Sequence, residues 1–171
     1  MRRALSLSVV CLITLVTGCG NEESSSEGSS SGSGKPPKNM CAAVAPAVPE
    51  DWNLTKTSAD SGKAKTDCTL ADSDGGTTLV VSLVKPRSGS VDDAYKELCD
   101  TYIGNPQERD DEECTKSGPM KLEGSPAELQ RGVRLDASQG VLWMTFRTNN
   151  PDHAAGAEDM MDDVEDAVSQ D

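Results

Sequence analysis

The chain has 171 residues, which is enough for a single domain once an N-terminal leader is set aside. Its formal net charge of −13 argues against nucleic acid as a partner, because binding to nucleic acid rewards clusters of Lys and Arg. The same acidity argues against electrostatic attraction to an anionic bilayer, so attachment to a membrane would have to be covalent.

The first residues have the features of a secretory leader. Arg2 and Arg3 precede an apolar run over residues 4–16, which is too short for a stable membrane span. The run ends in Leu-Val-Thr-Gly-Cys at residues 15–19, which resembles the lipobox of bacterial lipoproteins. In that family the cysteine thiol carries a diacylglycerol and the cysteine becomes the new N-terminus. The resemblance therefore implies lipidation of Cys19. An ordinary cleaved signal with an incidental cysteine is the alternative.

The segment after Cys19 is predicted to be a flexible tether. Residues 20–39 are rich in Gly, Ser and Glu and contain no hydrophobic residue, so they cannot bury enough surface to offset the entropy of ordering. Random-coil scaling gives such a tether a reach of roughly 25 Å. We therefore expect a signal peptide over residues 1–18, a lipid-attached linker over 19–39 and one domain over 40–171. The expected location is the outer face of the cytoplasmic membrane.

Four cysteines remain in the predicted domain, and an even number in an exported chain indicates two disulfides. Three pairings are possible. The favoured one joins Cys41 to Cys68, which would fasten the start of the domain to its first strand, and Cys99 to Cys114, which would close a helix onto the following loop. No Cys-x-x-Cys pair occurs and His153 is the only histidine, so neither a metal site nor a cofactor is expected.

Two hairpins are predicted from alternating apolar residues. The first consists of strands over residues 63–71 and 77–85, joined by a Gly- and Asp-rich turn over 72–76. The second consists of strands over about 127–137 and 141–148. In both hairpins the alternation places apolar side chains on one face, among them Leu79, Val81, Leu83, Leu129, Val133, Leu135, Leu142, Met144 and Phe146.

A helix is predicted after each hairpin. Ser90 is the expected N-cap of the first helix, with Asp93 in the capping-box position. Asn150 and Pro151 form a favourable start for the second helix. The first helix has an apolar stripe made of Val91, Ala94, Tyr95, Leu98, Cys99 and Tyr102. The second directs inward Ala157, Met160, Met161, Val164, Ala167 and Val168.

Together these units predict an α+β fold, in which an antiparallel sheet of four to six strands has its helices packed on one face. Short extra strands near Asn53 and Lys121 would widen the sheet. The order of elements resembles the PsbP-like sandwich of some actinobacterial lipoproteins of unknown function. The spacing of Cys41 and Cys68 is similar to the spacing of two cysteines in one such family. In that family a tryptophan often lies two residues after the second cysteine, whereas this chain has Leu70 at that position. The resemblance covers the predicted domain in outline and transfers no functional residue.

The polar motifs of the chain favour structural interpretations. The stretch from Asp72 to Gly75 resembles the opening of a calcium loop, but a strand follows directly, so a hairpin turn is favoured. The acidic run over residues 108–113 is interpreted as a solvated loop, with weak binding of divalent cations as the alternative. His153 is expected to be a solvated residue at a helix start. Because no nucleophile–base motif occurs, the chain is predicted not to be an enzyme.

Trp143 is the candidate binding residue. On its strand it points away from Leu142 and Met144, so it either marks a binding surface or lies beneath a loop or second layer. Trp52 is expected to pack near the start of the domain. The expected function is that of a tethered binding or interaction module for an unknown envelope protein or small ligand. The alternatives are a carboxylate-based hydrolase acting on envelope material, with two acids within about 10 Å, and a structural component of the envelope.

Overall fold

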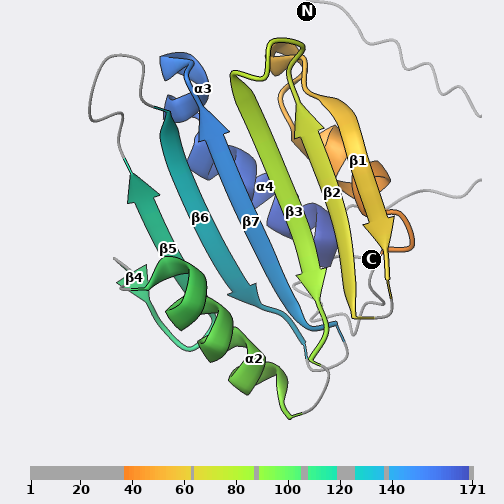
Figure 1. Cartoon of the computed structure of the whole chain (residues 1–171), viewed down its shortest axis with the longest axis vertical. Coiled ribbons are helices and arrows are strands. Elements are labelled where there is room, and N and C mark those ends of the chain that lie inside the picture. Colours follow the sequence, from red (N-terminus) through yellow and green to blue (C-terminus); the bar gives the residue numbers. More distant parts are fainter. Residues whose placement is uncertain are drawn as a thin grey trace, which may run out of the picture. The chain divides into compact units, whose positions relative to one another are not determined.

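A central antiparallel sheet with helices on both of its faces forms the domain in the computed structural model of this chain (Figure 1). The structure describes residues 37–62, 64–86, 89–104, 108–118, 126–136 and 139–169. The predicted leader, Cys19 and most of the predicted tether lie outside these residues. No helix in the described ranges combines the length and the apolar character that a membrane crossing requires.

Within these described ranges the sheet has seven strands in the order β1-β2-β3-β7-β6-β5-β4, and all neighbouring strands are antiparallel. The two predicted hairpins are β2–β3 and β6–β7, and they join at the centre of the sheet because β3 pairs with β7. There Leu79 lies opposite Phe146 and Val81 lies opposite Met144. The strands are β1 (Thr55–Ser61), β2 (Lys65–Ala71), β3 (Thr77–Val84), β4 (Glu108–Arg109), β5 (Glu113–Gly118), β6 (Ala127–Arg134) and β7 (Val141–Thr148).

The helical segments lie before, between and after the strands. Their predicted caps are confirmed: Ser90 and Asp93 form a capping box, and the Asn150 side chain accepts a hydrogen bond from the backbone N–H of Asp152. The segments are α1 (Met40–Val44), η1 (Ala45–Ala47), η2 (Glu50–Trp52), α2 (Val91–Leu98), η3 (Cys99–Ile103), α3 (Pro151–Ala155) and α4 (Ala157–Ser169).

The larger core lies between the sheet and the helices α1 and α4. The predicted apolar residues of β3, β6 and β7 point into it, where they meet Met160, Met161, Val164 and Val168 of α4. The predicted disulfide between Cys41 and Cys68 is present and links α1 to β2 inside this core. The alternating pattern therefore identified the buried face correctly.

A smaller core lies on the opposite face of the sheet, beneath α2. Val91, Tyr95, Cys99 and Ile103 pack there against Cys114, Val141 and Trp143. The second predicted disulfide, Cys99–Cys114, links η3 to β5 within this core. Figure 1 shows α2 in front of the sheet and α4 behind it.

The α+β fold and both disulfides are confirmed, whereas the expectation that the helices share one face is wrong in detail. The reason lies in β7, whose sequence Val-Leu-Trp-Met is apolar on both faces. Leu142 and Met144 are buried against α4, and Val141 and Trp143 are buried against the α2 layer. A strand of this kind must be covered on both sides, so the helices are divided between the faces.

A π-helical turn at the end of α2 changes which residue faces inward. Cys99–Ile103 form this turn, and the N–H of Gly104 donates to the carbonyl oxygen of Cys99. Because a π turn is wider than an α turn, the inward position moves by one residue. Ile103 is buried with 1% exposure, whereas Tyr102, predicted to continue the apolar stripe, is 60% exposed.

The sheet is wider than the two predicted hairpins. The short strand expected near Asn53 corresponds to β1, while the position near Lys121 lies outside the described residues. The acidic run at 108–113, interpreted as a solvated loop, instead starts in β4 and leads through a turn into β5. The Asp110 side chain stabilises that turn by accepting hydrogen bonds from the N–H groups of Glu112 and Glu113.

Candidate functional site

Two hollows in the described part of the domain are candidate sites, one on each side of the sheet. The polar pocket lies between α2 and the turn from β4 to β5, and it is lined by Asp92, Tyr95, Lys96, Asp110, Asp111 and Arg134. The apolar groove lies where α3 and α4 meet the sheet. It is lined by Ser117, Gly118, Ala127, Glu128, Leu129, Phe146, Pro151, Ala154, Ala155, Ala157 and Glu158.

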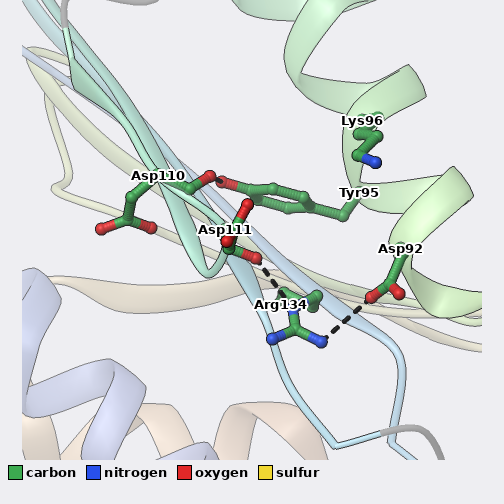
Figure 2. Close-up of a pocket in the computed structure, with 6 residues that line it drawn as sticks. All are labelled: Asp92, Tyr95, Lys96, Asp110, Asp111 and Arg134. Carbon is green, nitrogen blue, oxygen red and sulfur yellow. Dashed lines mark hydrogen bonds and ion pairs between the residues drawn. The ribbon is translucent and has the colours of Figure 1, made fainter.

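Arg134 of β6 is the central residue of the polar pocket, whose volume is about 340 Å³ (Figure 2). Its Nη1 lies 3.0 Å from Oδ1 of Asp92 at the start of α2. Its Nε donates to the carbonyl oxygen of Asp111 at 2.8 Å, and its Nη2 lies 3.6 Å from Oε1 of Glu112. A single guanidinium thus connects α2 to the β4–β5 turn.

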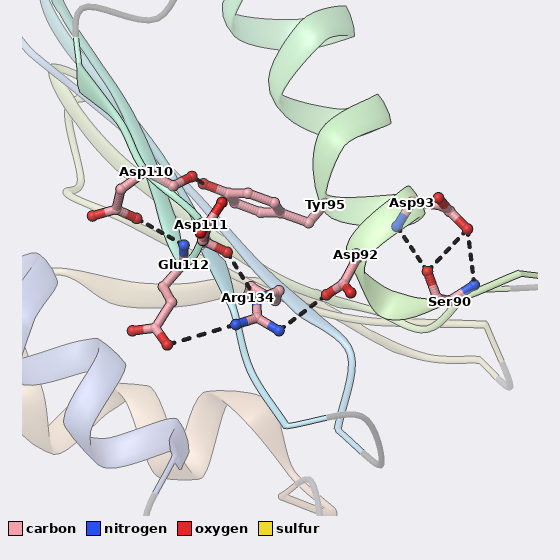
Figure 3. A network of polar contacts seen from close by, with 8 residues as sticks. All are labelled: Ser90, Asp92, Asp93, Tyr95, Asp110, Asp111, Glu112 and Arg134. Carbon is pink, nitrogen blue, oxygen red and sulfur yellow. Dashed lines mark hydrogen bonds and ion pairs between the residues drawn. The ribbon is translucent and has the colours of Figure 1, made fainter.

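Asp110 and Tyr95 complete this connection (Figure 3). The Tyr95 hydroxyl donates to the carbonyl oxygen of Asp110 at 3.1 Å. The backbone N–H groups of Glu112 and Glu113 donate to the Asp110 carboxylate, each at 2.7 Å. These hydrogen bonds favour the charged form and hold the pKa of Asp110 below its usual value. Asp93 also has a lowered pKa, caused by its hydrogen bonds to Ser90.

The polar pocket is therefore best described as a clamp that holds α2 against the sheet. A carboxyl group that acts as a general acid needs a raised pKa, which is the opposite of the shift at Asp110. Asp92 is engaged with Arg134. Across the ranges that the structure describes, no group of three or more potential ligand side chains is arranged to hold a metal ion.

The apolar groove has a volume of about 670 Å³. Its floor is a row across three neighbouring strands, because Ser117 lies opposite Leu129 and Leu129 lies opposite Phe146. Its wall comes from the corner between α3 and α4, where Pro151 and three alanines line the space. Because Leu129 and Phe146 are only 6% and 1% exposed, the accessible apolar surface of the groove comes mainly from the exposed Pro151 and Ala155. The volume falls within the range of roughly 300 to 1,000 Å³ that is usual for small-molecule sites.

His153 and Trp52 hold the α3 corner in place. Nδ1 of His153 lies 3.0 Å from Oγ1 of Thr77, which in turn lies 2.8 Å from Oγ1 of Thr148. The imidazole stacks on Trp52 with ring centroids 4.7 Å apart, and Trp52 packs against Phe146 at 5.4 Å. His153 is thus half-buried in a structural network, and its interpretation as a solvated residue is wrong. Trp52 packs near the start of the domain, as expected.

An ion-pair cluster surrounds Arg131, which lies two residues after Leu129 on the same face of β6. Arg131 is only 8% exposed. It contacts Asp162 of α4, lies 4.0 Å from Glu165, and approaches Glu113 to 3.1 Å without hydrogen-bond geometry. Burial raises the pKa of Glu165, and the positive charge of Arg131 only partly offsets this effect. One cation among three carboxylates leaves this cluster a formal charge of −2 (+1 − 3).

Trp143 lies beneath the layer formed by α2 and η3, which agrees with the second of the two interpretations of this residue. It is 8% exposed and its ring lies 5.4 Å from the ring of Tyr102, measured between centroids. The stretch from Asp72 to Gly75 forms the β2–β3 turn, in which the N–H of Gly75 donates to the carbonyl oxygen of Asp72.

The sequence analysis did not predict the apolar groove. Its only local signal is the run of small residues from Ala154 to Ala157.

Neither candidate site can be interpreted through a relative. No protein-family model, no curated protein and no solved structure matches this chain.

Proposed function

We propose that this chain is a lipid-anchored binding module that works at the outer face of the cytoplasmic membrane. The leader and the lipobox-like residues before Cys19 support the anchor. Both disulfides of the domain support an extracytoplasmic location, because disulfides persist in oxidising compartments. A relationship to the PsbP-like lipoproteins is part of the proposal, and it rests on the order of the elements and on the spacing of Cys41 and Cys68.

The apolar groove is the observation that carries the binding role. Pro151 and Ala155 are exposed in a hollow whose floor consists of the buried Leu129 and Phe146, so an apolar group that enters the groove would be removed from water. The clamp is less suited to this role, because Arg134, Asp92 and Asp110 are engaged in contacts within the domain. The ligand is therefore expected on the α4 side of the sheet.

A carboxylate-based hydrolase receives less support from the same residues. Such an enzyme needs one carboxyl group that stays protonated and a second one across the substrate. Glu165 has a raised pKa, but its surroundings are the ion pairs with Arg131, and it is not among the residues lining the groove. We therefore propose a binding protein without catalytic activity.

The anchor is tested by comparing Cys19→Ser with Cys11→Ser in the producing bacterium. The native chain and Cys11→Ser are expected in the membrane fraction, and mass spectrometry should find a diacylglyceryl group on their N-terminal Cys19. Cys19→Ser should lose both the lipid and the processing before residue 19. An unmodified native N-terminus located further along the chain would contradict the anchor.

The binding role is tested with a neutral, environment-sensitive apolar dye on residues 20–171, exported behind a leader that is not lipidated. The dye should gain fluorescence on the native chain, and Ala155→Trp should abolish the gain by filling the groove. Ala42→Trp is the matched control, because Ala42 is an exposed helical alanine of α1 outside the groove. Equal fluorescence of the two variants would contradict binding in the groove.

A further inference from the structure

We infer that the apolar groove selects amphipathic ligands whose apolar chain carries a positively charged head group. This inference rests on the proposed binding role and adds the chemical class of the ligand. It follows from the charges that lie beside the groove, which come from α4 and from the Arg131 cluster.

One carboxylate of α4 lines the groove, and two more follow it along the same side of the helix. Glu158 lines the groove itself, in the first turn of α4. Asp162 and Glu165 follow it at i+4 and i+7, so the three share one side of the helix. Asp162 and Glu165 are the residues that meet Arg131, and that cluster keeps a formal charge of −2 because Glu113 also joins it. The groove is therefore bordered by negative charge.

Among the residues that the structure describes, positive charge beside the groove is small by comparison. None of the described residues that line it is a lysine, an arginine or a histidine. Arg147 lies 3.4 Å from Glu128, which lines the groove, so this ion pair adds no net charge there. The N-terminus of α4 contributes about half a positive charge, and Glu158 and Asp159 in its first turn outweigh this.

An anionic head group would consequently be repelled at the position where a cationic one is attracted. The apolar chain of either ligand would contact the same apolar lining of the groove. Two ligands with identical chains and opposite head charges should thus differ only in the electrostatic contribution, which is modest at a partly exposed site.

The experiment compares octyltrimethylammonium with octyl sulfate, both below their micelle concentrations, on exported residues 20–171. Calorimetry gives the two affinities, and near-ultraviolet circular dichroism verifies that the domain stays folded. The cation is expected to bind about threefold to tenfold more tightly, the size of effect that one or two exposed charge pairs produce. Ala155→Trp should weaken the binding of both probes, whereas Ala42→Trp should leave both unchanged.

Two charge variants separate selection at the groove from attraction to an acidic chain. Glu158→Gln should reduce the preference for the cation, and Glu97→Gln, an exposed glutamate of α2 on the other side of the sheet, should preserve it. An equal reduction in both variants, or a preference for octyl sulfate, would overturn the charge selection while leaving the binding role intact. If the neutral dye and both charged probes fail to bind, the proposed function itself fails.

Discussion

Arg131 lies in a strand whose alternation already assigns it to the core face. Leu129, Arg131 and Val133 are at period two, and all three are buried on the side of α4. A buried arginine needs compensating carboxylates, because an unpaired charge away from water is costly. The sequence offers many candidates, and the fold selects Glu113 from β5 and Asp162 and Glu165 from α4.

Glu165 makes this cluster sensitive to pH. Its pKa is raised above the ordinary value of 4.5, so its contribution to stability is fully present below pH 4.5 and is lost as the pH rises through the raised pKa. Glu165→Gln removes this loss. The unfolding free energy of the variant relative to the native chain should therefore increase between acidic and neutral pH. Urea unfolding at a series of pH values measures it. Asp163→Asn, an exposed neighbour on α4, is the control, and a flat difference for Glu165→Gln would contradict the prediction.

At the scale of elements, the position of α2 depends on how closely η3 and β5 approach β6 and β7. Trp143 fills the space between the sheet and η3. Gly132, its partner on β6, has no side chain and lies directly beneath the indole. A Cβ atom on Gly132 would lie 2.8 Å from Cζ3 of Trp143 and 3.0 Å from Sγ of Cys114. Glycine at this position therefore lets the indole and the disulfide pack directly against β6.

Gly132→Ala is expected to destabilise the domain by about 1 to 3 kcal/mol, the usual cost of overpacking a core. Neither neighbour can move away easily, because the indole is buried and Cys114 is held in a disulfide. Gly118→Ala on β5 is the matched control, since its Cβ would make an ordinary contact of 3.6 Å with the Glu128 carbonyl oxygen. Urea unfolding curves of the two variants compare the sites. Equal midpoints would show that the α2 layer yields to an added methyl group.

At the scale of the whole molecule, the domain consists of two cores on the two faces of one sheet, and each core contains one disulfide. Cys41–Cys68 lies in the larger core and Cys99–Cys114 in the smaller one. Among the described residues, seven buried ones form the smaller core, so it has little apolar surface with which to hold α2. The disulfide and the Arg134 clamp supply the additional attachment at the two ends of that helix.

Replacing both cysteines of the smaller core with alanine should cost about 3 kcal/mol, because the disulfide closes a loop with a sequence separation of 15 residues. The same change at Cys41 and Cys68, which are separated by 27 residues, should cost about 3 to 4 kcal/mol. Urea unfolding gives both values. Hydrogen exchange should show that only the first pair of substitutions exposes α2 preferentially. Unchanged protection of α2 would mean that packing and the clamp suffice.

Features that depend on neighbours in the chain were predictable. The β2–β3 hairpin, the β6–β7 hairpin and the helix caps follow from contacts between residues a few positions apart, such as Ser90 with Asp93. The alternation along β3 and β7 likewise identified the face that packs against α4. The π turn after α2 was not predictable in this way, because the packing of Ile103 rather than local preference decides where the helix widens.

The sequence by itself determined the hairpins and the two main helices, since each is encoded by spacing along the chain, and it favoured one of three cysteine pairings. Only the tertiary structure decided on which face α2 lies, which carboxylates meet Arg131 and Arg134, and where the apolar groove opens. Arg131 and Asp162 are 31 residues apart, and Arg134 and Asp92 are 42 apart. The first contact needs α4 to pack on the sheet, and the second joins the two halves of the chain, which the pairing of β3 with β7 brings together.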